Sequence, residues 1–260
     1  MPGKHINNAK NLFIYTLLIT CFLISCRKKS STTTEKTVYA AGWIRNGQFS
    51  VARYWKNDVG ISLTDGTKNA LANAMAINGT DVYIAGYESN GSKRIAKYWK
   101  NGTAVNLTDG QNDATALGIA VDGQDVYVSG YESIGVNSVA KYWKNGTATN
   151  LTDGINNAAA NSIKIVQSDI YVTGYEFNGT KYIAKYWKNG VAVNLSSDGT
   201  INNNAIGIAI NGSDIYISGS QKVGSKNQAK YWKNGTAVYL TDGQNDAYAW
   251  NIDVSGSDIY

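Results

Sequence analysis

The sequence predicts an all-β fold, a β-propeller built from four-stranded blades, and three observations lead to this prediction. A unit of about 44 residues repeats from residue 37 to the end of the chain. Each unit holds four short stretches rich in Val, Ile, Tyr and Trp, separated by Gly, Asn and Asp. Repeats of this length are typical of either paired helices or propeller blades. Because no stretch carries a 3.6-residue apolar period long enough for a helix, the pattern favours strands and therefore blades.

Three sequence markers define the repeat. They are Ala-Lys/Arg-Tyr-Trp-Lys-Asn, Leu-Thr-Asp-Gly and Asp-Ile/Val-Tyr. The tryptophans of the first marker are 44 residues apart, except for a last interval of 45 that a one-residue insertion near Leu195 explains. An Asn-Gly pair follows in four copies and indicates a type I′ hairpin between the third and fourth strands. The marker tryptophans are Trp55, Trp99, Trp143, Trp187 and Trp232.

The two ends of the repeat region predict how a ring could close. Blades must stack about an axis, because a single blade is apolar on both faces. The repeat opens on a second strand at Thr37, and the last copy supplies a first strand over residues 247–254. Joining these segments would complete a fifth blade, so we expect five blades. Residues 258–260 already begin a strand that the N-terminal copy would provide, so six to eight blades stay open if the chain is a fragment.

Residues 1–36 predict a targeting segment and a tether. Basic residues precede an uncharged run, residues 11–26, which is shorter than the roughly 20 residues of a membrane-spanning helix and fits a signal peptide. The run ends in Leu-Ile-Ser-Cys, which resembles a bacterial lipobox and implies cleavage before Cys26 and acylation of that cysteine. An uncleaved anchor is the alternative. We therefore expect a signal peptide over 1–25, a lipidated cysteine with a flexible polar tether over 26–36, and the propeller over 37–260.

Composition excludes several kinds of chemistry. Residues 27–260 contain no His, Cys or Pro. This removes a disulfide framework, a zinc site with His or Cys ligands, and a Ser-His or Cys-His nucleophile, and we expect no cofactor. Beyond residue 36 the chain carries 18 of its 24 basic and 18 of its 19 acidic residues. The repeat region is thus neutral, and nucleic acid is not an expected partner.

The loop after the second strand is the best candidate for ligand binding, because in a propeller it shares a rim with the loop between blades. Three copies place a Tyr-Glu pair there, and the aspartates of the second marker belong to the neighbouring loop. Carboxylates beside flat aromatic faces suit carbohydrate binding. The alternative is turn chemistry, in which each Asp caps its own loop and the following Gly takes a positive φ. The candidate ligand-binding residues are Trp43, Tyr87, Glu88, Tyr131, Glu132, Tyr175, Glu176, Asp65, Asp109, Asp153, Asp198 and Asp242.

The Tyr-Trp pair of the third strand can be interpreted in two ways. The two side chains point to opposite faces of the strand. Burial between neighbouring blades is favoured, and exposed platforms for sugar stacking are the alternative.

Residues 109–113 and 242–246 cluster oxygen ligands, which makes calcium an alternative to the absence of a cofactor. The spacing is not that of an EF-hand and no glutamate closes a bidentate site, so no metal ligand is assigned. Glycoside hydrolysis needs two acids in different environments. Nearly every acid here occupies a repeated position; Asp58, Asp122 and Asp253 are exceptions, expected at hairpins or strand ends. We therefore expect a protein that is not an enzyme.

Together the markers AKYWKNG, LTDG and DVYVSGYE resemble those of uncharacterised repeat lipoproteins of Bacteroidota that are predicted to be β-propellers. The resemblance covers residues 37–260 and implies the fold and an outer-membrane lipid anchor, in either leaflet, but no activity. The tandem organisation is also similar to that of tachylectin, a five-bladed lectin with one sugar site per blade, although no motif is shared.

These observations favour a monomeric cell-envelope lipoprotein that acts as a binding module. Near-identical blades imply near-identical sites, which would suit multivalent capture of a polysaccharide. A protein-interaction scaffold in an envelope complex is the first alternative, and one large apolar patch on a rim would distinguish it. A carboxylate-dependent glycoside hydrolase or lyase is the second, and two acids converging in one pocket would distinguish it.

Overall fold

The computed structural model describes residues 36–196 and 201–260. The expected signal peptide, the lipidated Cys26 and nearly all of the tether lie outside the described residues, as does Asp198. Thr37–Tyr260 form one compact unit. Every regular element in the described ranges is a strand. These ranges contain no helix that is long and apolar enough to cross a membrane. The all-β prediction is confirmed.

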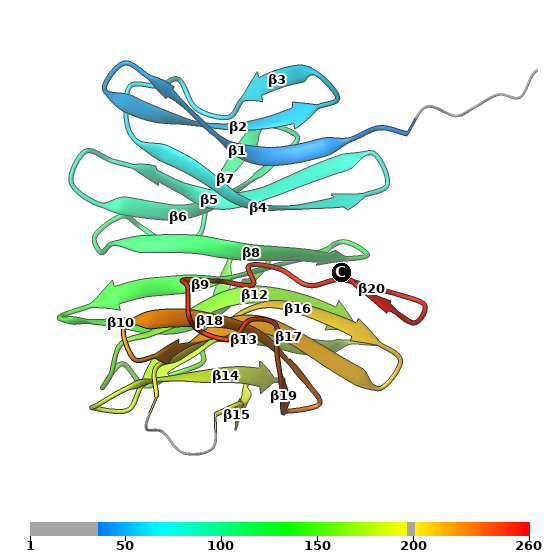
Figure 1. Cartoon of the computed structure of the whole chain (residues 1–260). Coiled ribbons are helices and arrows are strands. Elements are labelled where there is room, and N and C mark those ends of the chain that lie inside the picture. The colour runs from blue at the N-terminus through cyan, green and yellow to red at the C-terminus, as the bar shows by residue number, and fades with distance from the viewer. Residues whose placement is uncertain (1–35, 197–200) are drawn as a thin grey trace, which may run out of the picture. The chain divides into compact units, whose positions relative to one another are not determined.

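Four sheets of four strands make up most of the unit (Figure 1). Each is an antiparallel meander whose first strand contacts the first strand of the next sheet, so these first strands form the inside of the arrangement. The first two sheets are β4 (Ala70–Asn78), β5 (Asp81–Ser89), β6 (Arg94–Lys100) and β7 (Thr103–Asn106), then β8 (Ala114–Asp122), β9 (Asp125–Ile134), β10 (Asn137–Lys144) and β11 (Thr147–Asn150). The next two are β12 (Ala158–Val166), β13 (Asp169–Phe177), β14 (Tyr182–Lys188) and β15 (Val191–Asn194), then β16 (Asn203–Asn211), β17 (Asp214–Val223), β18 (Lys226–Lys233) and β19 (Thr236–Tyr239).

The meander gives the unit two rims with different connections. The turns between first and second strands and between third and fourth strands lie at one end of each sheet, which we name the hairpin rim. The turns between second and third strands and the connections between sheets lie at the other end, which we name the loop rim. The predicted ligand-binding residues Trp43, Tyr87, Tyr131 and Tyr175 precede loop-rim turns.

The two chain ends form incomplete sheets, and they do not join as the sequence analysis expected. At the N-terminal end β1 (Tyr39–Asn46), β2 (Phe49–Lys56) and β3 (Val59–Ser62) form a three-stranded sheet without an inner strand. At the C-terminal end β20 (Val254–Ser255) pairs with β21 (Asp258–Ile259) and not with β1. The pairing of β20 with β21 spans a short turn, so its loop-closure entropy is far smaller than that of a pairing across the whole chain. A fifth blade assembled from both ends is therefore not formed in the described residues.

The predicted type I′ hairpins are present on the hairpin rim. Asn145 and Gly146 have φ angles of 50° and 86°, and the other three Asn-Gly pairs have nearly the same values. Both central positions of a type I′ turn require a positive φ, which Asn and Gly tolerate best. In the first copy, where Asp58 replaces the glycine, only Asn57 has a positive φ.

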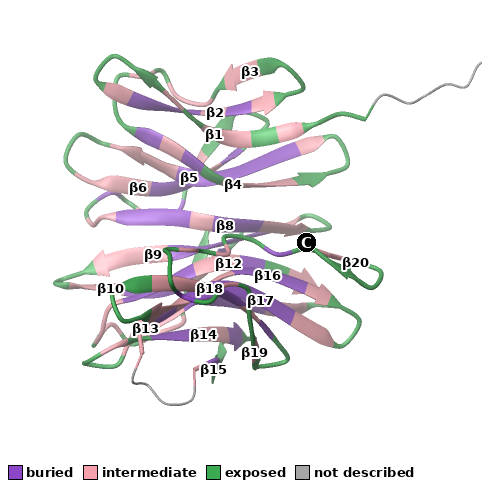
Figure 2. Ribbon diagram, in the orientation of Figure 1, coloured by how far each residue is buried: buried purple, intermediate pink, exposed green. Residues whose placement is uncertain are grey.

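Four of the five marker tryptophans are buried between sheets, as the favoured interpretation predicted, and Trp55 is half-buried. Trp99, Trp143, Trp187 and Trp232 are at most 1% exposed. Trp143 packs against Tyr83 and Ala96 of the preceding sheet, and Figure 2 shows this burial along the strands of neighbouring sheets. Burying about 150–250 Å² of each ring stabilises the fold by about 4–6 kcal/mol as an upper value.

A bulge in the inner strand explains the glycine that precedes each Tyr-Glu pair. The β8–β9 register shifts between Ala116 and Gly118, so Leu117 is an extra residue. A Cβ on Gly130, opposite the bulge, would lie 2.0 Å from the carbonyl oxygen of Thr115. Only glycine fits at this close approach. The corresponding glycines are Gly86, Gly174 and Gly219.

Candidate functional site

The hairpin rim repeats one polar cluster that joins two of the sequence markers. The Asn145 side chain accepts from Val126 N–H (2.8 Å) and donates to Asp125 (2.7 Å), whose other oxygen pairs with Lys144 at 2.7 Å. The ammonium also lies 5.1 Å from the centre of the Tyr127 ring. Hydrogen bonds from Lys144 and Asn145 lower the pKa of the Asp125 carboxyl. The same cluster occurs at Asp81, Asp169 and Asp214.

This hairpin-rim cluster is a structural clamp. It connects the start of the second strand to the hairpin between the third and fourth strands. Its carboxylates are bound by Lys and Asn side chains of the same sheet. In the sheet of β4–β7, the hydrogen bonds of the Lys100 ammonium with Tyr83 and Asp81 raise the pKa of Lys100 to about 12. The regular spacing of the two markers is therefore a consequence of the fold.

The glutamates of the Tyr-Glu pairs lie against buried lysines. Glu132 pairs with Lys141 at 2.6 Å, and Lys141 is buried on the face that carries Trp143. Glu88 and Glu176 make the same pair with Lys97 and Lys185. In the next sheet the amides of Asn203 and Gln221 take the carboxylate's place beside Lys230, each at 2.7 Å. The glutamate carboxylates thus compensate interior charges that would otherwise be costly.

The tyrosines of the Tyr-Glu pairs are half-buried on the loop rim and have unequal neighbours. The Arg94 guanidinium lies 5.6 Å from the ring centre of Tyr87 and 5.9 Å from that of Tyr131. Tyr182 meets Tyr175 edge to face at 5.1 Å. Burial raises the pKa of the Tyr87 and Tyr175 hydroxyls. Trp43, the equivalent residue of the three-stranded sheet β1–β3, is 50% exposed, so the four residues do not offer equivalent sites.

The aspartates of the second marker make the turns proposed as their alternative role. Asp109 accepts from Gln111 N–H at 3.0 Å, and the following Gly110 has a φ of 80°. Asp65, Asp153 and Asp242 accept from the corresponding N–H groups. Asp198 lies outside the described residues.

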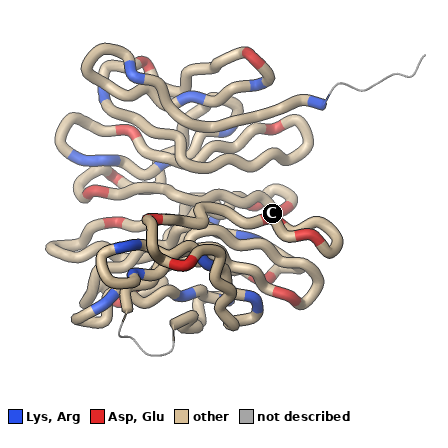
Figure 3. Tube along the Cα trace, in the orientation of Figure 1, with Lys and Arg blue, Asp and Glu red and all other residues tan. Residues whose placement is uncertain are grey.

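The second acid of each candidate calcium cluster is also occupied. Asp113 accepts from Arg94 N–H at 3.0 Å and pairs with Lys93 at 3.5 Å. Asp246 accepts from Asn227 N–H at 2.8 Å. In the described ranges no three acidic, His or Cys side chains come together as metal ligands would. Figure 3 shows acidic and basic residues interspersed along the trace.

One part of the loop rim departs from the repeat and exposes apolar side chains. Val136 is 95% exposed, Ile155 72% and Ile134 50%. The Asn137 amide donates to the Ile155 carbonyl at 2.7 Å, which brings the β9–β10 turn against the loop that leads to β12. We name Ile134, Val136 and Ile155 the apolar rim patch. Thr67, Gln111 and Gln244 stand at the position of Ile155 in other copies, and Ser92 and Thr180 at that of Val136.

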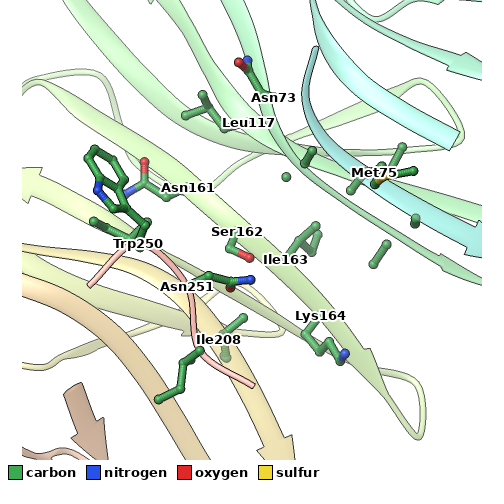
Figure 4. Close-up of a pocket in the computed structure, with 18 of the residues that line it drawn as sticks. Asn73, Met75, Leu117, Asn161, Ser162, Ile163, Lys164, Ile208, Trp250 and Asn251 are labelled. Atoms are coloured by element: carbon green, nitrogen blue, oxygen red, sulfur yellow. The ribbon is translucent and has the colours of Figure 1, made fainter. Parts of the chain in front are cut away.

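A central cavity of about 1000 Å³ lies among the inner strands. Its wall comes from β4, β8, β12, β16 and residues 250–253, with Ala41 of β1 (Figure 4). The bulge residues Asn73 and Asn161 donate to the carbonyls of Ala116 and Ala205 in the next inner strand, at 2.8 and 2.7 Å. None of the predicted ligand-binding residues that the structure describes lines this cavity.

Comparison with known proteins supports the architecture. No protein-family model matches the chain, and no curated protein matches it. Among solved structures it is similar to TolB from Acinetobacter baumannii, with 14% identity and a TM-score of 0.55 over 78% of this chain and 52% of that one. It is also similar to a prolyl endopeptidase, with 12% identity and a TM-score of 0.52 over 80% and 33% of the two chains. The chain has a β-propeller fold. It spans about half of the first neighbour and a third of the second, so nothing beyond the fold carries over.

Sequence reasoning missed the two features of this propeller that differ between repeats, the apolar rim patch and the cavity wall. Repetition itself hides them, because the markers dominate any self-comparison. The available signal was the residues that change at a fixed repeat position. At the bulge these residues are Asn73, Leu117, Asn161, Ile206 and Trp250.

Proposed function

We propose that the chain is a cell-envelope lipoprotein whose β-propeller is a binding module for a protein partner, contacted through the apolar rim patch. The observation that supports this is an exposed apolar cluster on the loop rim, where Val136 is 95% and Ile155 72% exposed. Exposed apolar clusters of this kind mark interaction sites more often than chance. In the other copies polar residues stand at the positions of Val136 (Ser92, Thr180) and Ile155 (Thr67, Gln111, Gln244), so the described residues combine these two apolar side chains at one junction between sheets.

The polar surroundings suit such a contact. Asn137 fixes the patch by its hydrogen bond to Ile155, so little conformational entropy is lost on binding. The aromatic cluster of Tyr175, Phe177 and Tyr182 belongs to the next sheet, and Phe177 N–H donates to Asn157 O in the same loop as Ile155. Apolar and aromatic side chains framed by polar groups are the usual composition of an interface core.

Site-specific photocrosslinking in cells tests this proposal. A photoreactive residue at Val136 or Ile155 should give one discrete adduct with a protein, whereas the same residue at Val191, an exposed valine of β15, should give none. Val136→Ser with Ile155→Gln, which restores the residues of other copies, should abolish copurification of the crosslinked protein. Equal adducts from all three positions, or copurification that survives the double change, would contradict the proposal.

Multivalent polysaccharide binding is the second candidate. It is favoured by the recurrence of Trp43, Tyr87, Tyr131 and Tyr175 at one repeat position on the loop rim. A glycan array with and without calcium tests it. Saturable binding that falls when Tyr87, Tyr131 and Tyr175 are replaced by Ala, with the fold intact, would support it. If the folded protein binds no glycan on the array, polysaccharide binding is excluded as a candidate function.

Hydrolysis is not proposed. Among the described residues that line the cavity, Asp253 is the only carboxylate, and a two-acid mechanism needs a second acid beside it.

The proposed lipid anchor rests on the lipobox-like sequence that ends at Cys26. Incorporation of labelled palmitate that Cys26→Ala abolishes is its test.

A further inference from the structure

The central cavity carries two charges that the repeat does not require. Ala76 and Ala120 lie at one level of its wall, and Ala209 occupies the same repeat position in β16; each is paired with the tyrosine of the third marker on the neighbouring strand. Lys164 occupies the same register opposite Tyr171, and Asp253 exchanges backbone hydrogen bonds with Tyr260 in the same way. Two repeats have therefore replaced a methyl group at the cavity wall, one by an ammonium and one by a carboxylate.

The fold uses neither charge in an ion pair. The ion pairs among the described residues involve other lysines, arginines and acids, and none includes Lys164 or Asp253. Both side chains are exposed to the cavity. The Asp253 carboxylate accepts from Val254 N–H at 3.0 Å, and one of its oxygens stays open. The two groups do not form an ion pair with each other in the structure, so a ligand could bridge them.

The same wall offers a flat apolar surface and amides. Trp250 is 71% exposed and stacks on Tyr248 with ring centres 5.6 Å apart. In the view of Figure 4, Ser162 and Asn251 lie between Trp250 and Lys164. Asn161 uses its amide nitrogen on the next inner strand, which leaves its carbonyl oxygen as an acceptor. An indole face attracts both apolar groups and ammonium ions.

We propose that the central cavity binds a small zwitterion whose carboxylate meets Lys164, whose ammonium meets Asp253, and whose body lies on Trp250. Charge-assisted hydrogen bonds are stronger than neutral ones. The cavity volume suits a ligand larger than a single amino acid. Two sources supply this chemistry, a short peptide with free termini and an amino sugar that bears a carboxylate. The site is independent of the apolar rim patch.

Calorimetric titration of the full chain, purified in detergent, tests the proposal. The probes are the peptide Ala-Phe-Ala, its N-acetylated and C-amidated forms, and muramic acid. The free peptide or muramic acid should bind about tenfold or more tightly than a form that lacks either charge. Binding of one probe and not the other identifies the body that the cavity accepts.

Two variants that restore the repeat residue connect each charge to its partner. Lys164→Ala should weaken the free and N-acetylated peptides about tenfold and leave the C-amidated peptide unchanged. Asp253→Ala should weaken the free and C-amidated peptides and leave the N-acetylated one unchanged. Lys68→Ala, on the loop rim, is the control and should change nothing. Lys164→Met keeps the aliphatic stem and replaces Lys164→Ala if that variant unfolds.

Three outcomes would overturn the proposal. They are equal binding of capped and free peptides, binding that neither variant changes, and no measurable binding of either probe up to about 5 mM. Because these titrations do not involve the rim, their failure would leave the crosslinking test of the protein-binding function intact.

Discussion

The two rims of the propeller are built from one repeating unit and yet differ in what they keep constant. On the hairpin rim four sheets repeat the same Asp, Tyr, Lys and Asn cluster with nearly the same distances. On the loop rim one repeat position near the start of the third strand holds a different kind of side chain in most copies. The residues there are Ser50, Arg94, Ser138, Tyr182 and Asn227. The difference teaches that the residues that recur hold the sheets together, whereas those that vary are free to make one asymmetric surface.

The largest effect is expected where a recurring residue is fully buried. Trp143→Ala should lower the free energy of unfolding by about 3–5 kcal/mol, because it removes the ring that fills the space between two sheets. Trp55→Ala should cost clearly less, since Trp55 is only half-buried and its sheet is the first one in the part of the chain that the structure describes. Denaturant titration measures both, and equal losses would contradict the inter-sheet role.

A recurring residue at the loop rim comes next. Glu132→Ala should destabilise the protein by about 3 kcal/mol, because it leaves the buried Lys141 ammonium without its carboxylate. Glu132→Gln should cost much less, since Gln221 faces Lys230 in the fourth complete sheet. If the two variants unfold at the same denaturant concentration, the ion pair is not what holds this position.

The hairpin rim should respond more weakly to single changes. Asn145→Ala removes two side-chain hydrogen bonds, each worth about 0.5–1 kcal/mol, and replaces Asn by a residue that tolerates a φ of 50° less well, which costs about 1 kcal/mol more. Asn145→Gly keeps the backbone conformation and should lose only the two hydrogen bonds. The difference between the two variants in thermal unfolding separates strain from bonding, and a zero difference would exclude strain.

Acid should loosen the hairpin rim. The pKa values of Asp81, Asp125, Asp169 and Asp214 are lowered by their hydrogen bonds to Asn and Lys. Their contribution is present above the unfolded pKa, about 3.9, and is lost as pH falls through the lower folded values. Unfolding midpoints measured from pH 5 to pH 2 should fall, and Asp125→Asn should make this fall less steep. An unchanged slope would show that the clamp does not titrate with folding.

The smallest effect on stability is expected at the residues that vary. Val136→Ser with Ile155→Gln should change the free energy of unfolding by less than about 0.5 kcal/mol, because both side chains are mostly exposed. Calorimetric melting measures this change. A large loss would show that the apolar rim patch supports the fold and would weaken its role in binding.

The sequence was sufficient for the blade because its signals are local. The four-strand meander, the Asn-Gly turns and the buried Trp99 follow from short-range periodicity and turn chemistry. Closure of the ring could not be predicted, because it depends on whether residues 247–254 pair with β1 or with the residues that follow them. The spacing of the repeat is the same in both cases, and local pairing of β20 with β21 is what the structure has.

The candidate site was harder to predict for a similar reason. A Tyr-Glu pair reads the same whether its glutamate faces solvent or a buried lysine, and Lys141 lies nine residues away on the neighbouring strand. The charges of Lys164 and Asp253 had no motif around them. Their shared place on the cavity wall is recognised only when the same repeat position is compared between the inner strands of the structure.

The inter-sheet hydrogen bonds of the bulge asparagines also bear on how the chain folds. Asn73 reaches Ala116, and Asn161 reaches Ala205, across 43 and 44 residues, which is one repeat. Contacts between sheets therefore seldom require a chain segment to pair with anything beyond the next repeat, which limits their sequence separation to about one repeat. A folded sheet provides a surface on which the next sheet can pack as the chain is synthesised. Folding can therefore proceed from the N-terminal end, one repeat at a time.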